Sequence, residues 1–425
     1  MFVSARESVD SFVASTFAGP PPRGLPALPP VARLSPLVVR VVGMNPSAFT
    51  LQGTNTYLVG RGPTRWLVDS GEGKPAYVPE LRRALEAEGV TRLAGILLTH
   101  WHHDHVGGVA DVRALLADMK ATAAEKNASS ENDASDDDPP VVVVPAYKRV
   151  RRDKGERSIP LSAPAEAHRA SRTYVDLEDG QILDAVPGAT LRVSLTPGHA
   201  EDHACFELVE EGSVFAGDCV VNGTTANFED LAAYSASLER MAKELEASKA
   251  NAEAKCAEAK RSARRSSEDD DAHDDDAAAA AVADGCVDAV ASEAPAFGRL
   301  YPSHGDVIAD GSKKLEEYRA HRFRREENFV EELRAARTRE PERGGLTCWE
   351  LCRRTYGASV PWLVLHHACA PITRQHLAKL VEEGRVVEER GAGLARFWRA
   401  AKYTPSEEEM KKTKPRRETT RGRRA

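Results

Sequence analysis

The chain has 425 residues, of which 41% are hydrophobic and 29% are charged. This apolar content is sufficient for a folded core, and no run of about 18 apolar residues occurs, so neither a wholly disordered chain nor an ordinary transmembrane helix is expected. The net charge of −7 is unevenly spread, because the part from residue 311 onward carries 27 Lys and Arg against 17 Asp and Glu. A basic C-terminal part favours an anionic partner such as nucleic acid, although it can equally serve only for solubility.

The first 36 residues are rich in proline and are expected to form a flexible leader. This leader has few basic residues and no apolar core segment, so it predicts neither a transit peptide nor a secretory signal. The seven cysteines are scattered and odd in number. They are expected to be free thiols of an intracellular protein, either mitochondrial or cytoplasmic.

The periodicity of apolar residues predicts an alternation of strands and helices along most of the chain. The expected strands cover residues 37–42, 56–59, 66–69, 93–98, 141–144, 174–177, 191–195, 204–209 and 213–216, and the expected helices cover 78–88, 109–119, 315–337 and a segment from about 229.

These elements predict a first domain over residues 37–310, interrupted by two polar insertions at about 120–140 and 242–295. The insertions contain few large apolar residues, so they are expected to be disordered. Short helices followed by a strand pair near 386–387 and 395–398 predict a small winged-helix-like domain over 311–403. Residues 404–425 are expected to form a basic tail.

The strongest chemical signal is the segment Thr-His-Trp-His-His-Asp-His-Val-Gly-Gly at residues 99–108, directly after the expected strand 93–98. Five potential metal ligands lie within six residues, and imidazoles with a carboxylate but no thiolate suit zinc or a similar divalent cation. Three further turns, each marked by Gly or Pro, place His199, Asp218 and His304 after expected strands or at the start of the C-terminal part. Rigid strand ends of this kind hold ligands in place.

This set of residues resembles the metallo-β-lactamase superfamily, whose first motif His-x-His-x-Asp-His is matched by residues 100–105. The resemblance implies an α/β fold, an αββα sandwich, with two Zn²⁺ ions per chain. By position, His100, His102 and His199 would hold the first metal, Asp104, His105 and His304 the second, and Asp218 would bridge both. Two such ions lower the pKa of bound water to ~7, so a hydroxide bridging them would act as the nucleophile, with Asp104 and Asp218 as the catalytic carboxylates.

A finer resemblance concerns residues 45–60, 218–238 and 318–326, which are similar to the β-lactamase-like protein 2 endoribonuclease group of the glyoxalase-II-like branch. It implies a zinc-dependent endoribonuclease that cleaves single-stranded RNA. A basic winged-helix-like domain could steer the RNA toward the metals. No protein partner is predictable.

Three other functions stay open at this point. A thioester hydrolase of the glyoxalase II type would use the same metal ligands equally well. An iron-dependent persulfide dioxygenase needs only part of the set, and a non-catalytic nucleic-acid-binding protein needs none of it, so the complete set disfavours both.

Several residues near these motifs are candidates for supporting the metals or contacting substrate. Superfamily resemblance suggests that Asp69 accepts a hydrogen bond from a metal-bound imidazole, and the alternative is a carboxylate that caps a turn. The remaining candidates, for which packing or surface roles are the alternative, are Thr54, Asn55, Thr56, His203 and Asn227.

Overall fold

The computed structural model describes residues 19–128, 144–170, 172–266, 297–340, 343, 345–357, 360, 365–390 and 396–401. The chain divides into two compact units after Ala320, somewhat later than the expected boundary at 310. Within the described ranges, none of the helices combines the length and the apolar character needed to span a membrane.

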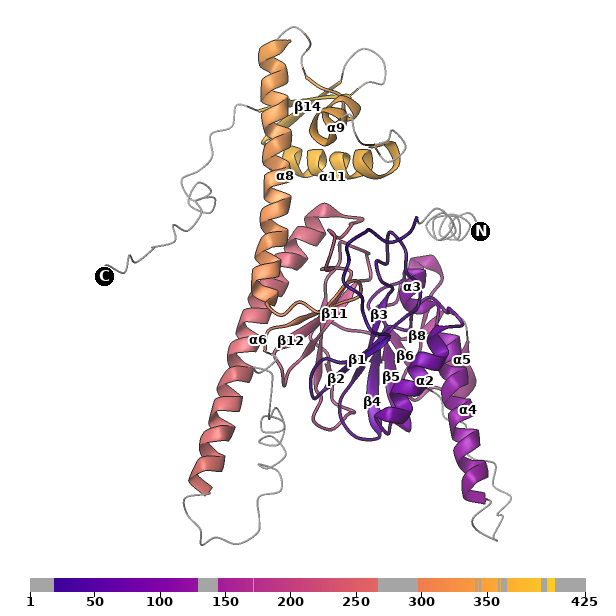
Figure 1. The fold of residues 1–425 in the computed structure, drawn as a ribbon. Helices are drawn as coiled ribbons and strands as arrows, with labels where there is room; N and C mark the ends of the chain where they lie inside the picture. The colour runs from indigo at the N-terminus through magenta and orange to yellow at the C-terminus, as the bar shows by residue number, and fades with distance from the viewer. Residues whose placement is uncertain are drawn as a thin grey trace. The chain divides into compact units, whose positions relative to one another are not determined.

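The first unit contains two β-sheets that lie face to face (Figure 1). The first sheet has eight strands in the order β1 (Val31–Arg33), β2 (Val38–Val42), β3 (Asn55–Val59), β4 (Thr64–Val68), β5 (Arg92–Leu97), β6 (Ala146–Lys148), β8 (Thr173–Asp176) and β7 (Arg157–Ser158). The second has five strands in the order β13 (Leu300–Pro302), β12 (Ser213–Gly217), β11 (Ala204–Leu208), β10 (Leu191–Leu195) and β9 (Ile182–Leu183).

The central strands of the first sheet are buried on both faces, and alternate residues serve two different cores. Trp66 and Val68 of β4 face the core between the sheets, together with Phe206 and Phe215 of the second sheet. Leu67, between them in sequence, packs in the core under the covering helices. This two-residue alternation is the normal pleat of a strand.

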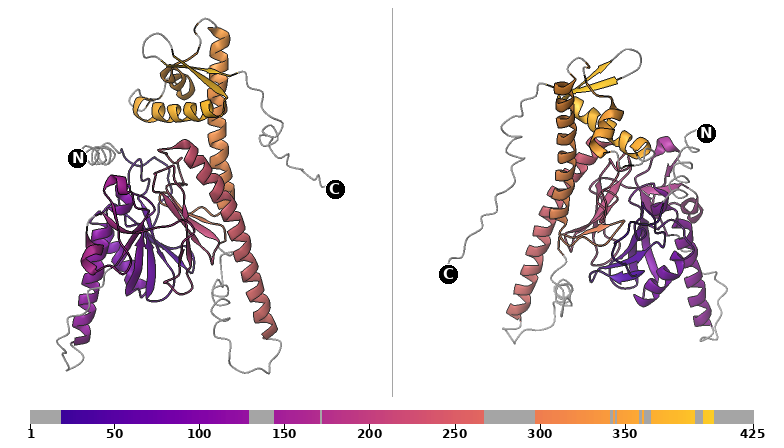
Figure 2. Two further views of the ribbon diagram at one scale, coloured as in Figure 1. Left: turned by 180° about the vertical axis from the view of Figure 1, so that it is seen from behind. Right: turned by 45° about the horizontal axis from the view of Figure 1, so that its top comes forward.

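Helices cover the outer faces of both sheets, which gives the expected αββα layering (Figure 2). The helical segments of this unit are α2 (Tyr77–Ala87), α3 (His103–Val106), α4 (Val109–Ala128), η1 (Arg152–Lys154), α5 (Ala165–Arg169) and α6 (Leu231–Ser266), followed by the first residues of α8 (Gly311–Arg339). Strands β4, β5, β6 and β8 are parallel, so their carboxyl ends, where the loops to α3 and η1 begin, share one edge of the sheet.

The second insertion is not disordered where it begins, contrary to expectation. Residues 242–266 continue α6, in which Leu238, Leu245, Ala252 and Cys256 are buried. Their spacings of seven or four residues, about two turns or one, place them on one face of the helix, where two of the buried positions are small residues. The rest of this insertion, residues 267–296, lies outside the described residues.

Two other expectations about local structure also differ from the outcome. Helix α4 extends through residues 120–128 of the first insertion. The strand expected at 141–144 lies, except for Val144, outside the described residues, and the next strand of the sheet covers 146–148. Residues 31–33 of the leader form a strand that pairs with β2, because this sheet edge offers unpaired backbone groups.

The second unit contains the rest of α8, then α9 (Cys348–Tyr356), η3 (Leu365–Cys369), α11 (Ala370–Glu382) and the antiparallel hairpin β14 (Val386–Arg390) and β15 (Arg396–Ala400). Its core includes Phe329, Leu333, Leu351 and Leu377. A helical C-terminal region with a hairpin is therefore present as expected, whereas its description as a winged helix stays a prediction. The basic tail lies outside the described residues.

Candidate metal centre

The segment of residues 99–108 leaves the carboxyl end of β5 and turns at once into α3. Two glycines make this turn possible. A Cβ on Gly108 would lie 2.0 Å from the Ser70 carbonyl oxygen, and one on Gly107 would lie 2.7 Å from that of Glu72. The loop after β4 can therefore pack directly against the start of the helix.

The first group of candidate ligands consists of three imidazoles whose ring nitrogens face one another. His100 Nε2 lies 2.7 Å from His102 Nδ1, and His199 Nε2 lies 3.2 Å and 3.1 Å from these two atoms. His199 reaches this point from the turn after β10, and its Nδ1 donates to the Asn227 carbonyl oxygen at 2.9 Å. Because Nδ1 of His199 carries the proton in that hydrogen bond, the lone pair on Nε2 would be available to a cation.

Burial makes these imidazoles poor bases. Burial, together with the neighbouring His199, lowers the pKa of His102 to about 3. Burial also lowers the pKa of His199 to about 4, although the Asp218 carboxylate opposes this change. Neutral imidazoles whose lone pairs converge are in the state that binds a metal.

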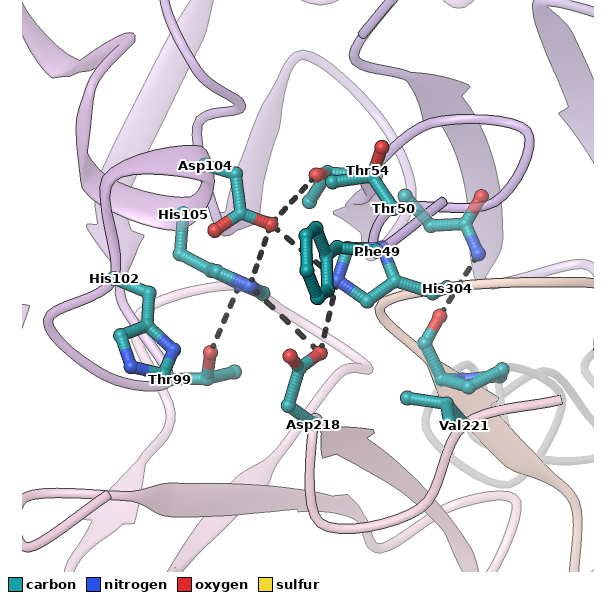
Figure 3. Close-up of polar contacts among 12 residues, drawn as sticks. Phe49, Thr50, Thr54, Thr99, His102, Asp104, His105, Asp218, Val221 and His304 are labelled. Carbon is teal, nitrogen blue, oxygen red and sulfur yellow. Dashed lines mark hydrogen bonds and ion pairs between the residues drawn. The ribbon is translucent and has the colours of Figure 1, made fainter. Parts of the chain in front are cut away.

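The second group lies beside the first and combines a carboxylate with two imidazoles (Figure 3). Asp104 Oδ2 lies 3.1 Å from His105 Nε2 and 3.3 Å from His304 Nε2. Burial would lower the pKa of His304, but Asp218 and Asp104 raise it to about 10. These carboxylates therefore favour a positive charge at this position, which a proton or a metal cation can supply.

Asp218 belongs to both groups. Its Oδ2 lies 3.5 Å from His199 Nε2, and its Oδ1 lies 3.2 Å from His304 Nε2 and 3.7 Å from His105 Nε2. All seven ligands predicted from the sequence thus come together in two adjacent groups, one with His100, His102, His199 and Asp218, the other with Asp104, His105 and His304.

The donor atoms fit a pair of divalent cations. His105 Nε2 and Asp218 Oδ1 are buried, and within the described structure they make the ion-pair contacts given above but no hydrogen bond. Buried polar atoms without a hydrogen bond are rare, and imidazole with carboxylate is a typical donor set for zinc. A cation in each group would satisfy these atoms.

Asp69, at the end of β4, lies directly behind the second group, where it was expected to act. Its Oδ2 lies 2.8 Å from His105 Nδ1, and its Oδ1 accepts from the Thr99 backbone N–H at 2.9 Å. The carboxylate therefore fixes both the orientation of the His105 ring and the beginning of the ligand loop.

The other predicted residues have mainly structural positions. Asn55 donates through Nδ2 to the backbone oxygens of Pro302 and Gly305, so it holds the turn that carries His304. His203 is buried, and its Nε2 accepts the Asp218 backbone N–H at 3.2 Å. Both residues support ligands and do not line the pocket.

Thr56 has no role at the metal centre. Its hydroxyl donates to the Val41 carbonyl oxygen and contacts the Tyr77 hydroxyl. Both contacts lie between the first sheet and the helices that cover it. A substrate contact for this residue was therefore wrong. Asn227, in contrast, lines the pocket as expected.

The candidate ligands open into a pocket of about 690 Å³. Apolar and aromatic side chains form much of its wall, among them Met44, Phe49, Trp101 and Val221. Phe49 is 57% exposed and lies over the second group in Figure 3. Phe49 could not be selected from the sequence, because a single aromatic residue in a polar loop has no characteristic spacing.

Thr54, a candidate for contacting substrate, instead contacts a candidate metal ligand and is absent from the pocket lining. Its hydroxyl lies 3.0 Å from Asp104 Oδ2, and it receives a hydrogen bond of 3.0 Å from Asn45 Nδ2. Asn45 in turn donates to Glu72 Oε2 at 3.1 Å. A polar chain thus links the loop between β2 and β3 to a candidate metal ligand.

Comparisons with known proteins agree with this architecture. The sequence profile described as "Metallo-beta-lactamase superfamily" matches residues 49–257. The lactamase-like protein nscB of Aspergillus fumigatus is 35% identical over 382 residues, which cover 88% of this chain and 87% of that protein. A protein of Aspergillus chevalieri named "Atrochrysone carboxyl ACP thioesterase" is 32% identical over 374 residues, covering 88% of this chain and 91% of that protein.

A solved structure supports the fold. The β-lactamase domain protein of Burkholderia ambifaria superimposes with a TM-score of 0.54 at 17% sequence identity, covering 91% of this chain and 98% of that one. The profile match and the 35% identity to the lactamase-like protein nscB over 88% of this chain show that the chain belongs to the metallo-β-lactamase superfamily.

Proposed function

We propose that the protein is a metal-dependent thioester hydrolase that releases an acyl group from an acyl carrier protein. The observation that carries this proposal is the 32% identity, over 88% of the chain, to a relative named as an ACP thioesterase. The pocket agrees, since a set of hydrolytic ligands opens into a space with apolar walls. Thioester hydrolysis was the alternative that the sequence left open, although with a glutathione-type substrate.

The endoribonuclease activity expected from the finer resemblance has no support from these relatives, whose names describe lactamase-like proteins and a thioesterase. That expectation relied partly on the positive charge of the C-terminal part. Much of this charge belongs to residues 402–425, outside the described residues. RNA cleavage is therefore replaced by thioester hydrolysis as the proposed activity.

We infer that two zinc ions occupy the centre. His100, His102 and His199 would hold one, Asp104, His105 and His304 the other, and Asp218 both. Bound there, such ions would supply Lewis acidity and would lower the pKa of water, which hydrolysis at neutral pH requires.

The protein's own groups then orient the reactants. Asp104 lines the pocket with 21% of its side chain exposed, and the Thr54 hydroxyl fixes one of its oxygens. The other oxygen can accept a proton from the attacking water. Phe49 and Trp101 offer apolar surface to the acyl group, which would place the thioester carbonyl over the ligands.

The proposal predicts hydrolysis of an acyl group from a carrier protein by the zinc-loaded enzyme. One preparation, with its metal content measured, would be assayed on an aromatic acyl-carrier protein, the same acyl group on coenzyme A, and a 5′-labelled single-stranded RNA. Asp218→Asn is the inactive control, because it removes the charge shared by both groups. Release of the acyl group from the carrier protein supports the proposal. Cleavage of RNA alone, or no thioester turnover with two zinc ions bound, contradicts it.

A further inference from the structure

Four charged side chains form a buried cluster beside the metal centre, in the first unit. Lys148 is completely buried, Asp202 is 2% exposed, and Arg151 and Glu156 are each 6% exposed. Two cations and two anions make the cluster neutral overall. None of these side chains belongs to the two ligand groups.

The contacts within this cluster are direct. Lys148 Nζ lies 2.7 Å from Glu156 Oε2 and 2.5 Å from Asp202 Oδ2. Arg151 donates from its backbone N–H to Glu156 Oε2 at 2.9 Å and from its guanidinium to Glu156 Oε1 at 3.0 Å. Charges buried this deeply are tolerated only when they are paired, so removal of one partner leaves the others buried without a counter-charge.

One end of the cluster reaches the loop that carries His199. Asp202 follows His199 by three residues in a tight turn, which is closed by backbone hydrogen bonds from Thr196 to His203 and from His203 to Ala200. Lys148 ends β6 in the first sheet, whereas this turn joins β10 and β11 in the second. The ion pair between Lys148 and Asp202 therefore ties the two sheets together at the edge where the ligands lie.

The other end of the cluster reaches the loop that carries His102. The Arg151 guanidinium lies 4.6 Å from the centre of the Trp101 ring, in cation–π geometry. The Trp101 ring in turn contacts the His102 ring, with 4.5 Å between their centres. Arg151 thus supports the wall of the pocket and, through it, a candidate ligand.

We propose that Lys148 and Arg151 are positioning residues for the first metal position, formed by His100, His102 and His199. These ligands come from two different sheets, so their spacing depends on how the sheets are held together. The cluster contacts both loops that carry these ligands, and it therefore holds the ligands at their spacing before a cation binds. Such preorganisation raises affinity, because less conformational freedom is lost on binding.

The test measures zinc affinity by chelator competition in the full-length protein, in a His304→Ala background that weakens the second position. Lys148→Met and Asp202→Asn are each compared with Arg65→Met. Arg65 is also a buried cation of this unit, paired with Glu88 at 3.2 Å, but it lies at the opposite end of β4 from Asp69. Its loss should lower stability without changing the metal position.

We expect Lys148→Met and Asp202→Asn to weaken zinc binding by roughly 10–100-fold, the range found when groups behind metal ligands are removed. Arg65→Met should leave the affinity unchanged. Circular dichroism of each metal-free variant checks folding, and Asp202→Asn, which keeps the shape of the side chain, decides the result if Lys148→Met does not fold. A folded Lys148→Met or Asp202→Asn protein with unchanged zinc affinity would overturn the proposal. The readout uses zinc alone, so it is independent of the substrate proposed above.

Discussion

Replacing Thr54 with valine should weaken the second metal position without changing any ligand. Thr54 is completely buried, and its hydroxyl lies 3.0 Å from Asp104 Oδ2. Valine has nearly the same shape but cannot donate a hydrogen bond. The Asp104 carboxylate would lose the contact that holds its orientation, and Asn45 Nδ2 would lose one of its two acceptors.

The size of the effect follows from the type of hydrogen bond. A hydrogen bond to a charged group contributes about 1.5–3 kcal/mol. Since every 1.4 kcal/mol corresponds to a factor of ten in an equilibrium constant, zinc should bind the second position roughly 10–100-fold more weakly. Thr54→Ser keeps the hydroxyl and should stay close to the unmodified protein.

The measurement is chelator competition for zinc in a His199→Ala background, which leaves the second position. Thr56→Val is the matched control. Thr56 is just as buried, and its hydroxyl is also hydrogen-bonded, but its partners are Val41 and Tyr77. Thr56→Val should therefore reduce stability and leave zinc affinity unchanged. Equal zinc affinity in Thr54→Val and Thr54→Ser would refute the role assigned to the Thr54 hydroxyl.

Three further predictions concern substrate, metal and pH. Phe49→Ala should raise KM for a bulky acyl thioester more than it lowers kcat, with little change in thermal stability because Phe49 is 57% exposed; an unchanged KM would exclude it from the substrate wall. Removal of metal by chelation should abolish thioester turnover, and added zinc should restore it. Burial lowers the pKa of His376 in the second unit. As the pH falls below about 6.5, the unfolded chain therefore binds a proton at this residue before the folded chain does, and the free energy of unfolding should decrease. His376→Gln should flatten this dependence in denaturant titrations between pH 7 and 5, and an unchanged slope would assign it to other groups.

The residues most easily read from the sequence were the ligands themselves. His100, His102, Asp104 and His105 lie within six residues, so their local spacing alone indicated a metal-binding loop. The strands before His199 and Asp218 could also be predicted, because alternating apolar residues mark a strand wherever it lies in the fold.

Other features were misjudged because low complexity was equated with disorder. Residues 242–266 have few large apolar side chains, yet Ala252 and Cys256 pack as part of a long helix. Small residues can be buried when a neighbouring surface is already in place. Such surfaces come from residues distant in sequence, as where Ser248 of α6 donates to Glu207 of β11, and a local interpretation of the segment cannot include them.

The sequence by itself determined which atoms can bind the metals, because ligand chemistry belongs to the residue type and its immediate spacing. Only the tertiary structure decided how those atoms are supported and what they face. Thr54 and Lys148 contact residues distant in sequence, and Phe49 lines a pocket that such residues share. Such contacts depend on how the two sheets stack, and for this reason the substrate pocket was harder to predict than the metal ligands.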